Sequence, residues 1–269
     1  MPATSKLSPR IAEIRIHPIK SLDPVSLVET TIGPGGGLRY DRAWALYSAD
    51  GQWVNAKRTP AIQLVRAEYA ADLSSVTLRS PNDTRNIPAR TFGFPTGYEE
   101  AAEWFSVFFE QQLIVRFDPG GFPDDPVANG PTIVSTASLQ SVCEWFPQIT
   151  LEGARRRFRT SLEIAGVPPF WEDQLFSENE RNVVRFRIGE VNFEGSNPCA
   201  RCPVPSRDPY TAENVDGFQK RFHQLRAETL PPWSPRDRFD HFYRLSTNTR
   251  VASSEAHKPL RLNDSLELL

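Results

Sequence analysis

Hydrophobic and polar residues alternate over much of the first 80 positions of the chain. Apolar residues two positions apart mark three short stretches: Ile14 and Ile16, then Val25 and Leu27, then Ala43, Ala45 and Tyr47. Such spacing predicts strands with one buried face. A glycine-rich loop at 33–37 interrupts the pattern, and Asp50-Gly51 predicts a hairpin turn. Short strands joined by turns favour a β-barrel or sandwich over a parallel α/β sheet.

Helical spacing of apolar residues occurs at three places further along the chain. Residues 99–111 place Ala and Phe side chains on one face, with two glutamates at the end where the helix dipole favours negative charge. A second helix is predicted to begin after Ser135 or Thr136, each able to cap it, with Cys143 on its buried side. Residues 216–226 predict the third helix.

The second half of the chain also predicts strands, at residues 158–165, 183–188, 242–245 and 266–268. Residues 186–193 predict a hairpin with glycine first in its turn. A segment rich in Pro, Gly and Asp at 118–130 is the predicted boundary between residues 1–118 and 119–269. We therefore expect a mainly β protein with peripheral helices, built from two packed barrel-like parts. The length of 269 residues suits one large or two closely packed domains.

The composition is that of a globular protein, with 39% hydrophobic and 24% charged residues. A net charge of −2 offers no general attraction to nucleic acid, so we expect no nucleic-acid partner. No apolar run follows the first ten residues and no 18 apolar residues occur together, so we expect neither a secretory signal nor a membrane partner. Three cysteines make no disulfide framework and favour a reducing, cytoplasmic location.

The main candidate for chemistry is Cys199-Ala200-Arg201-Cys202, which follows the predicted hairpin. Thiolates are soft ligands for transition metals, and a neighbouring Arg lowers the pKa of a thiol. Three other interpretations stay open. A structural zinc site needs four ligands, two more than this motif supplies. The remaining candidates are Cys143 and four histidines, which do not have the spacing of zinc ligands. A thioredoxin-like pair would begin a helix in a βαβ unit, and two packed structural thiols would need no ligand at all.

Cations accompany hydroxyls near the ends of the predicted strands. Lys20 and Ser21 follow the first strand, Arg42 precedes another, and Lys57 lies beyond the hairpin. Such donors match phosphate oxygens, although each alone is also typical of a solvated loop. The basic run at 155–159 lacks the net charge and interleaved aromatics of a nucleic-acid patch. Asp208-Pro209, six residues after Cys202, is by itself a turn signal.

Taken in order, these segments resemble the MOSC (molybdenum cofactor sulfurase C-terminal) family with its N-terminal MOSC β-barrel domain. Within that family the chain is similar to the amidoxime-reducing proteins and their bacterial relatives. The resemblance runs from about Ile11 to Leu268. It is carried by IHPIKS at 16–21, YDRAW at 40–44, NAK at 55–57, STASL at 135–139, FR at 158–159, and CARC at 199–202 with DP at 208–209. The chain departs from the family pattern at Thr160-Ser161.

The resemblance implies a molybdenum cofactor (Mo-molybdopterin) with Cys202 as the protein ligand to the metal. The residues that it implies for gripping the phosphate and pterin are Lys20, Ser21, Arg42, Lys57 and Arg159, with Ser135, Thr136 and Ser138 near the same pocket. Asp208 is a candidate catalytic residue that would orient water or a second donor. We expect the four cations to meet in one positive cleft, with Cys202 as the thiol that lines it.

The implied activity is oxo transfer: reduction of a small N-hydroxylated substrate with electrons from a separate electron-donor protein. The cysteines of an appended iron–sulfur domain and the pyridoxal-phosphate domain of sulfurases are both missing from this sequence. The alternative function is a molybdenum cofactor carrier or sulfur-transfer module without turnover of its own. A third hypothesis is a structural β-protein with paired thiols.

Overall fold

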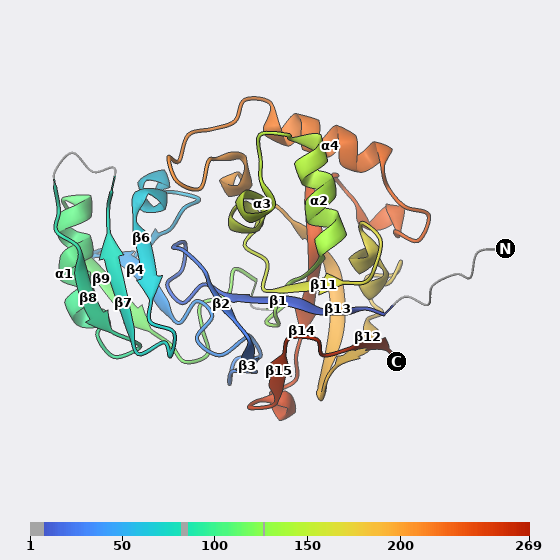
Figure 1. The fold of residues 1–269 in the computed structure, drawn as a ribbon, viewed down its shortest axis with the longest axis horizontal. Helices are drawn as coiled ribbons and strands as arrows, with labels where there is room; N and C mark the ends of the chain where they lie inside the picture. The colour runs from blue at the N-terminus through green and yellow to red at the C-terminus, as the bar shows by residue number, and fades with distance from the viewer. Residues whose placement is uncertain (1–7, 82–85, 126) are drawn as a thin grey trace.

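The structure, a computed structural model, describes residues 8–81, 86–125 and 127–269. Two sequence predictions fall partly outside these residues. They are the absence of a secretory signal, which concerns residues 1–7 among others, and the boundary segment 118–130, which includes position 126. Sixteen strands and four α-helices occur among the described residues, so the prediction of a mainly β protein is confirmed. None of those helices is long and apolar enough to cross a membrane. Figure 1 shows α1 with β4 and β6–β9 on one side, and α2, α3 and α4 over the strands of the other.

An eight-stranded sheet forms the centre of the larger part, in the order β16-β12-β13-β14-β10-β11-β1-β2. Only the β10–β11 pairing is parallel among its described pairs. Its strands are β1 (Arg10–Ile16), β2 (Val25–Leu27), β10 (Ile133–Ser135), β11 (Leu162–Ala165), β12 (Val184–Ile188), β13 (Val191–Ala200), β14 (Arg244–Arg250) and β16 (Leu266–Leu268). Because β1 pairs with β11, both halves of the sequence contribute to one sheet.

Three smaller sheets complete the β structure. They contain β4 (Trp44–Ser48), β5 (Trp53–Val54) and β9 (Leu113–Phe117); β6 (Arg66–Tyr69), β7 (Ser75–Arg79) and β8 (Arg90–Gly93); and β3 (Glu29–Thr31) with β15 (Pro259–Arg261). The predicted hairpin turn lies between β4 and β5, where Gly51 takes a positive φ of 83°. Each sheet of the described residues is open, and none closes into a barrel.

Three hydrophobic clusters hold these elements together. In the N-terminal part, Trp44 of β4 packs with Phe105 of α1 (Tyr98–Phe109), the helix predicted from the spacing at 99–111. A second cluster under the large sheet includes Ile14 of β1. The third lies among the helices, where Phe158 and Phe222 have ring centroids 5.6 Å apart. Burial of aromatic side chains on this scale is a main source of stability in such cores.

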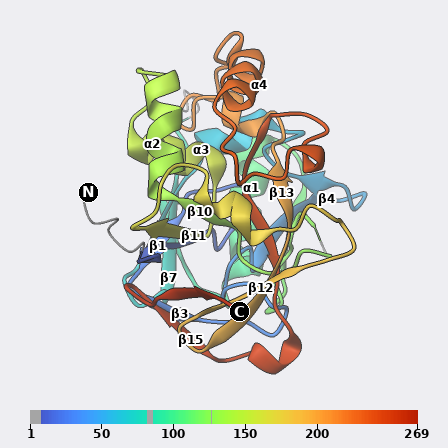
Figure 2. The same cartoon turned by 90° about the vertical axis from the view of Figure 1, so that its right-hand side faces the viewer.

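The helices of the second half follow the predictions in two cases and differ in a third. Helix α2 (Thr136–Trp145) is capped by Ser135, and α4 (Phe218–Glu228) starts two residues later than predicted. Figure 2 shows α2 above β10 and β11. The prediction of a strand over 158–165 was wrong in its first half, because α3 (Leu151–Phe158) ends at Phe158 and residues 159–161 connect it to β11. This two-turn helix is short and mostly polar, and its local signals are the capping residue Thr150 and the spacing of Leu151, Ala154 and Phe158 on one face.

The carboxyl group of Glu172 is buried below α2. Its residue is 1% exposed, and Ser138 Oγ donates a hydrogen bond to Oε2 at 2.9 Å. Burial, helped by the neighbouring Asp173 carboxylate, raises the pKa of Glu172 to about 7. The folded protein therefore binds this proton more tightly than the unfolded chain does. The resulting stability is fully present below the unfolded pKa of about 4.3 and is lost as the pH rises through 7.

Replacing Glu172 with Gln should remove this pH dependence, because the amide cannot ionise but still accepts a hydrogen bond from Ser138. Urea unfolding of both proteins at pH 4.5 and pH 8 measures the difference, since all other groups are shared. At each pH, the free energy of unfolding of the wild type is subtracted from that of the variant. We expect this difference to be about 2 to 3 kcal/mol larger at pH 8 than at pH 4.5. The same stability difference at both pH values would contradict the prediction.

Candidate functional site

A cavity of about 460 Å³ lies where the loops of the two parts meet. Its walls come from the residues after β1, the loops around β4 and β5, the segment 120–132, the end of α3 and the segment 197–205. This volume is within the range of about 300–1,000 Å³ that is usual for small-molecule sites. The cavity is the principal candidate for a binding site.

Most of the residues implied by the resemblance meet at this cavity. Lys20, Arg42, Lys57 and Arg159 all line it, together with Ser21 and Cys202. They come from five separate segments of the chain, so their convergence is a product of tertiary folding. Ser21 ties two of these segments together, because its Oγ accepts a hydrogen bond from the backbone N–H of Ala56 at 3.0 Å.

Arg159 is a cavity cation with an incomplete set of hydrogen bonds. It ends α3 in a left-handed conformation, with φ of 52°, which turns its side chain away from the helix and toward the cavity. Nη1 donates to the Leu22 carbonyl at 2.7 Å, whereas the buried Nη2 has no hydrogen-bond partner among the described atoms. Burial, followed by the charge of Arg42, lowers the pKa of Arg159 to about 10. An anion in the cavity would offset the repulsion between the two guanidinium groups.

Arg42 is held in place by the preceding residue. Its guanidinium pairs with Asp41 Oδ2, while Asp41 Oδ1 accepts the backbone N–H of His17 at 2.7 Å. Burial alone would lower the pKa of Arg42, but the carboxylates of Asp41 and Asp124 raise it. Arg42 therefore presents a fixed positive charge to the cavity.

Two of the three cysteines reach the cavity. Cys202 is exposed, and Cys199 is half-buried at the end of β13. Arg201 lies next to Cys202 in the sequence, but its Nη1 is 3.1 Å from Cys199 Sγ. The arginine therefore supports the thiol of Cys199. Cys143 lies on α2 and is half-buried, where burial raises the pKa of its thiol.

The thiol of Cys202 has no set of protein co-ligands beside it. Across residues 8–81, 86–125 and 127–269, no three His, Cys, Asp or Glu side chains gather in a way that could hold a metal ion. A metal at Cys202 would therefore need most of its ligands from a bound cofactor.

The three hydroxyl residues at the start of α2 do not line the cavity. Ser135 caps the helix by accepting the N–H of Ser138, and Thr136 donates to Glu163 Oε1 at 2.7 Å. Ser138 donates to Glu172. The three hydroxyls are hydrogen-bonded to the helix backbone or to the buried carboxylates of Glu163 and Glu172. The N-terminus of α2 therefore faces protein groups in the structure.

Asp208 is likewise placed outside the cavity walls. Its Oδ1 accepts the backbone N–H groups of Tyr210 and Thr211, at 2.9 and 3.1 Å, which is the turn expected from the Asp-Pro pair. Its Oδ2 lies 3.3 Å from Nη2 of Arg157, and Arg157 does line the cavity. Asp208 can therefore act on the site only through Arg157 in this arrangement.

Several cavity residues carried no signal in the sequence. Asn197 of β13 and Asn248 of β14 are partners in the sheet register, and both side chains belong to the walls. Ser161, one of the two positions that depart from the family pattern, also lines the cavity. So does Asp124, from the segment predicted to be a linker. Lone polar residues of this kind are unremarkable until the sheet and loops bring them together.

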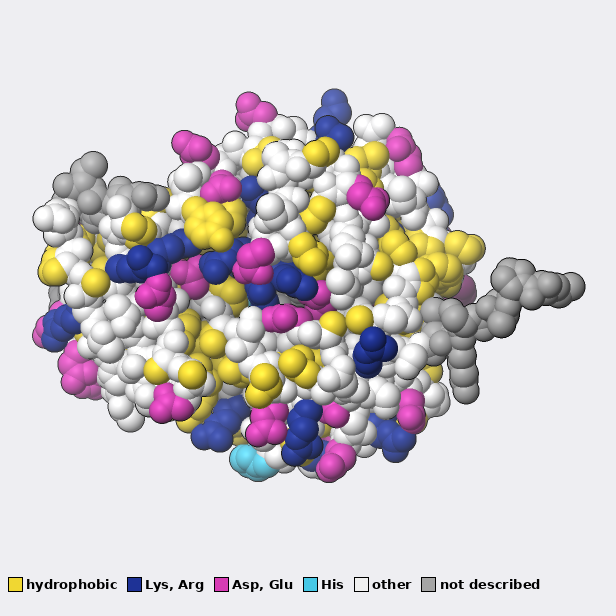
Figure 3. Space-filling view, viewed as in Figure 1, with side chains coloured by type: hydrophobic (Ala, Val, Ile, Leu, Met, Phe, Trp, Pro, Cys, Tyr) yellow, Lys and Arg dark blue, Asp and Glu magenta, His cyan; other side chains and the backbone are white. Residues whose placement is uncertain are grey.

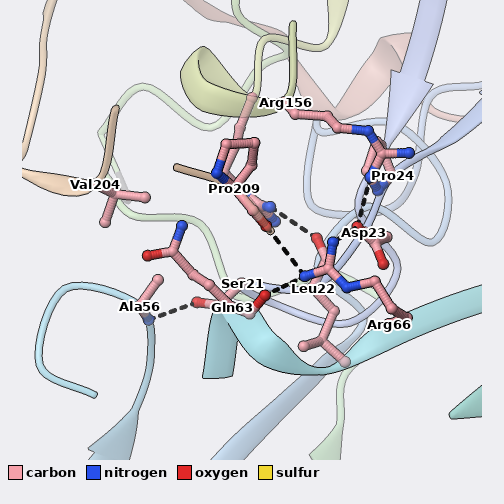
Figure 4. Close-up of a pocket in the computed structure, with 11 residues that line it drawn as sticks. Ser21, Leu22, Asp23, Pro24, Ala56, Gln63, Arg66, Arg156, Val204 and Pro209 are labelled. Atoms are coloured by element: carbon pink, nitrogen blue, oxygen red, sulfur yellow. Dashed lines mark hydrogen bonds and ion pairs between the residues drawn. The ribbon is translucent and has the colours of Figure 1, made fainter. Parts of the chain in front are cut away.

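A second, much smaller cavity of about 20 Å³ lies beside the first and shares Ser21, Ala56, Arg159 and Val204 with it. Figure 4 shows Arg66 and Arg156 approaching Asp23 there, at 3.1 and 2.6 Å. Its volume suits about one water molecule. It is too small for a cofactor, and Arg66 and Arg156 already share the carboxylate of Asp23.

The basic run at 155–157 is paired with acidic groups. Arg155 lies 2.8 Å from Glu163, and Arg156 also lies 3.0 Å from Glu152. Figure 3 shows basic and acidic side chains side by side in a band across the face of the molecule that is turned to the viewer in Figure 1. These contacts form an ion-pair network, in contrast to Arg159, which extends into the cavity.

Comparisons with known proteins match most of the chain. One family model, described as the MOSC N-terminal beta barrel domain, matches residues 8–112, and another, the MOSC domain, matches residues 131–255. The boundary at residue 118 stays a prediction. Mitochondrial amidoxime-reducing component 1 of Mus musculus is 26% identical over 238 residues, covering 75% of this chain and 66% of that protein. Molybdenum cofactor sulfurase of Drosophila grimshawi is 25% identical over 229 residues, covering 74% and 28%. The solved structure of the YUAD protein from Bacillus subtilis covers 97% of this chain at 11% identity, with a TM-score of only 0.38.

Proposed function

We propose, from the premise that this chain belongs to the MOSC domain family, that its cavity binds a molybdenum–pterin cofactor and that the protein reduces small N-hydroxylated compounds. The observation that carries the proposal is the meeting of Lys20, Arg42 and Arg159 with Cys202 on one cavity. The names of the relatives, an amidoxime-reducing component and a molybdenum cofactor sulfurase, add support. At about 25% identity they leave the specific reaction to be tested.

The residues present fit such a group. The cofactor's phosphate would be attracted by the charge of Arg159 and by the fixed charge of Arg42. Lys57 and Ser21 would contact it from the loops on the N-terminal side. Cys202 would offer an exposed thiol, which binds a soft metal as the thiolate.

When bound, the cofactor supplies two-electron oxygen-atom transfer, by which an N–OH group becomes N–H and, with two electrons and two protons, water is released. The chain's own residues bind and orient: cations hold the phosphate, and Cys202 tunes the metal as its ligand. Arg201 holds Cys199 and thereby steadies the segment that presents Cys202. Asp208 acts as a positioning residue through Arg157. Electrons come from a separate donor protein.

Protein from a host able to make the cofactor tests this proposal. We expect stoichiometric molybdenum by metal analysis, and reduction of an amidoxime or hydroxylamine with a chemical reductant such as reduced methyl viologen. Protein from a host unable to make the cofactor is the control. A preparation that carries no molybdenum would refute cofactor binding.

A carrier or sulfur-transfer role is the second candidate, favoured by the match to a sulfurase over 74% of this chain. The same cavity would serve it. Turnover separates the two functions, because a carrier should retain and release the cofactor without reducing any N-hydroxylated compound. Loaded protein that transfers its cofactor to another apoenzyme yet reduces no substrate would therefore favour the carrier.

A further inference from the structure

We propose that Asp124 is an internal counter-anion: its carboxylate occupies the anion subsite of the ligand-free protein, and a ligand binds by displacing it with a phosphate group. Asp124 is then a specificity-determining residue, because it favours ligands that carry a dianion over neutral or singly charged ones. This inference rests on the proposed function, since it concerns the same cavity.

The geometry pairs a fixed cation with an accessible anion. Asp124 Oδ1 lies 2.7 Å from Lys20 Nζ. Lys20 is only 8% exposed, donates to the Phe122 carbonyl at 2.8 Å, and lies 4.7 Å from the centre of the Trp53 ring. The Asp124 side chain, in contrast, is 77% exposed. The lysine cannot leave without losing its packing, whereas the carboxylate can turn into water at little cost.

Two further cations of the site, Arg42 and Arg159, also act on this carboxylate. The charges of Arg42, Lys20 and Arg159 keep the pKa of Asp124 below its ordinary value. All three cations therefore act on one singly charged group. A phosphate dianion brings roughly twice the charge and more acceptor oxygens, so it is the better partner for the same three donors.

The backbone around Asp124 is anchored on both sides. Phe122 packs on Trp53, with ring centroids 5.7 Å apart. Asn129 Nδ2 donates to the Gly35 carbonyl at 2.9 Å. Next to Asp124, Asp125 Oδ1 accepts the backbone N–H of Val127 at 2.9 Å, a contact that shapes the loop. Asp124 takes no part in these contacts, so its side chain can move while the loop stays attached.

Phosphate binding to the cofactor-free protein tests the inference. Calorimetric titration with inorganic phosphate and with pyrophosphate, at constant ionic strength, should show the Asp124→Asn variant binding about two- to fivefold more tightly than the wild type, the range expected for loss of a partly exposed competing ion pair. Asp125→Asn is the matched control, because it removes the same charge from the same cavity and keeps the loop contact. We expect its affinity to change by less than about twofold. Asp124→Glu, which keeps the carboxylate, should stay close to the wild type.

The inference is wrong if Asp124→Asn binds phosphate no more tightly than the wild type, or if Asp125→Asn gains as much. It is also wrong if no variant binds phosphate, because the subsite would then not exist. These outcomes are independent of molybdenum. A protein that never retains molybdenum, yet gains phosphate affinity only in Asp124→Asn, would refute the proposed function and support the counter-anion.

Discussion

Replacing Cys202 with Ala is expected to abolish reduction of N-hydroxylated substrates while leaving the fold intact. The thiol is exposed at the cavity, so its loss removes a metal ligand but little packing. Groups that only support a metal ligand typically contribute about 10- to 100-fold to metal affinity or activity. We expect the loss of the ligand itself to exceed about 100-fold, with stability changed by no more than about 0.5 kcal/mol, as for other surface substitutions.

Activity per bound molybdenum, together with thermal unfolding, measures both halves of this prediction. Cys199→Ala is the matched control: Cys199 lines the same cavity, and its loss should be milder because the thiol contacts protein groups, Arg201 and the Ala200 carbonyl. A Cys202→Ala protein that binds molybdenum and turns over at the normal rate would show that the metal ligand has been assigned to the wrong residue.

Replacing Arg159 with Met should weaken cofactor retention about 10- to 100-fold, because hydrogen bonds to charged groups contribute roughly 1.5–3 kcal/mol. The cofactor-free protein should lose little stability. In that state the guanidinium has a buried nitrogen without a partner and is repelled by Arg42, so its removal relieves an unfavourable contact. The variant therefore separates binding from folding.

Molybdenum content after dialysis and urea unfolding of the cofactor-free protein measure the two effects. Arg159→Lys keeps the charge but loses the paired donors, so it should fall between the wild type and Met. If Arg159→Met unfolds readily without cofactor and retains molybdenum normally, the residue supports the fold and not the ligand.

Local sequence patterns predicted the elements whose signals are local. The alternation at Ile14 and Ile16, the Asp50-Gly51 turn and the apolar face of residues 99–111 all correspond to structure. Each depends on residues within a few positions of one another, where strand or helix period is visible. Helix α3 was missed because it is only two turns long, so its three apolar positions, Leu151, Ala154 and Phe158, are too few to establish a period.

The sequence predicted which residues belong to the candidate site, but it did not predict the shape of the cavity or the contacts of those residues. The resemblance named Lys20, Arg42, Lys57, Arg159 and Cys202, and the structure brings these five together. It could not show that the hydroxyls at 135–138 are taken up by Glu163 and Glu172. Those hydrogen bonds join residues 27 to 34 positions apart, beyond the reach of any periodic pattern.

From the sequence alone came the mainly β character, the principal helices and the chemical types of the candidate site, because propensity, spacing and side-chain chemistry are properties of neighbouring residues. Tertiary structure decided that β1 pairs with β11 across the chain, that Arg201 supports Cys199, and that Asp124 lies against Lys20. Each of these depends on which distant surfaces pack together. The free energy of that packing is a sum over the whole fold, and no short segment carries it.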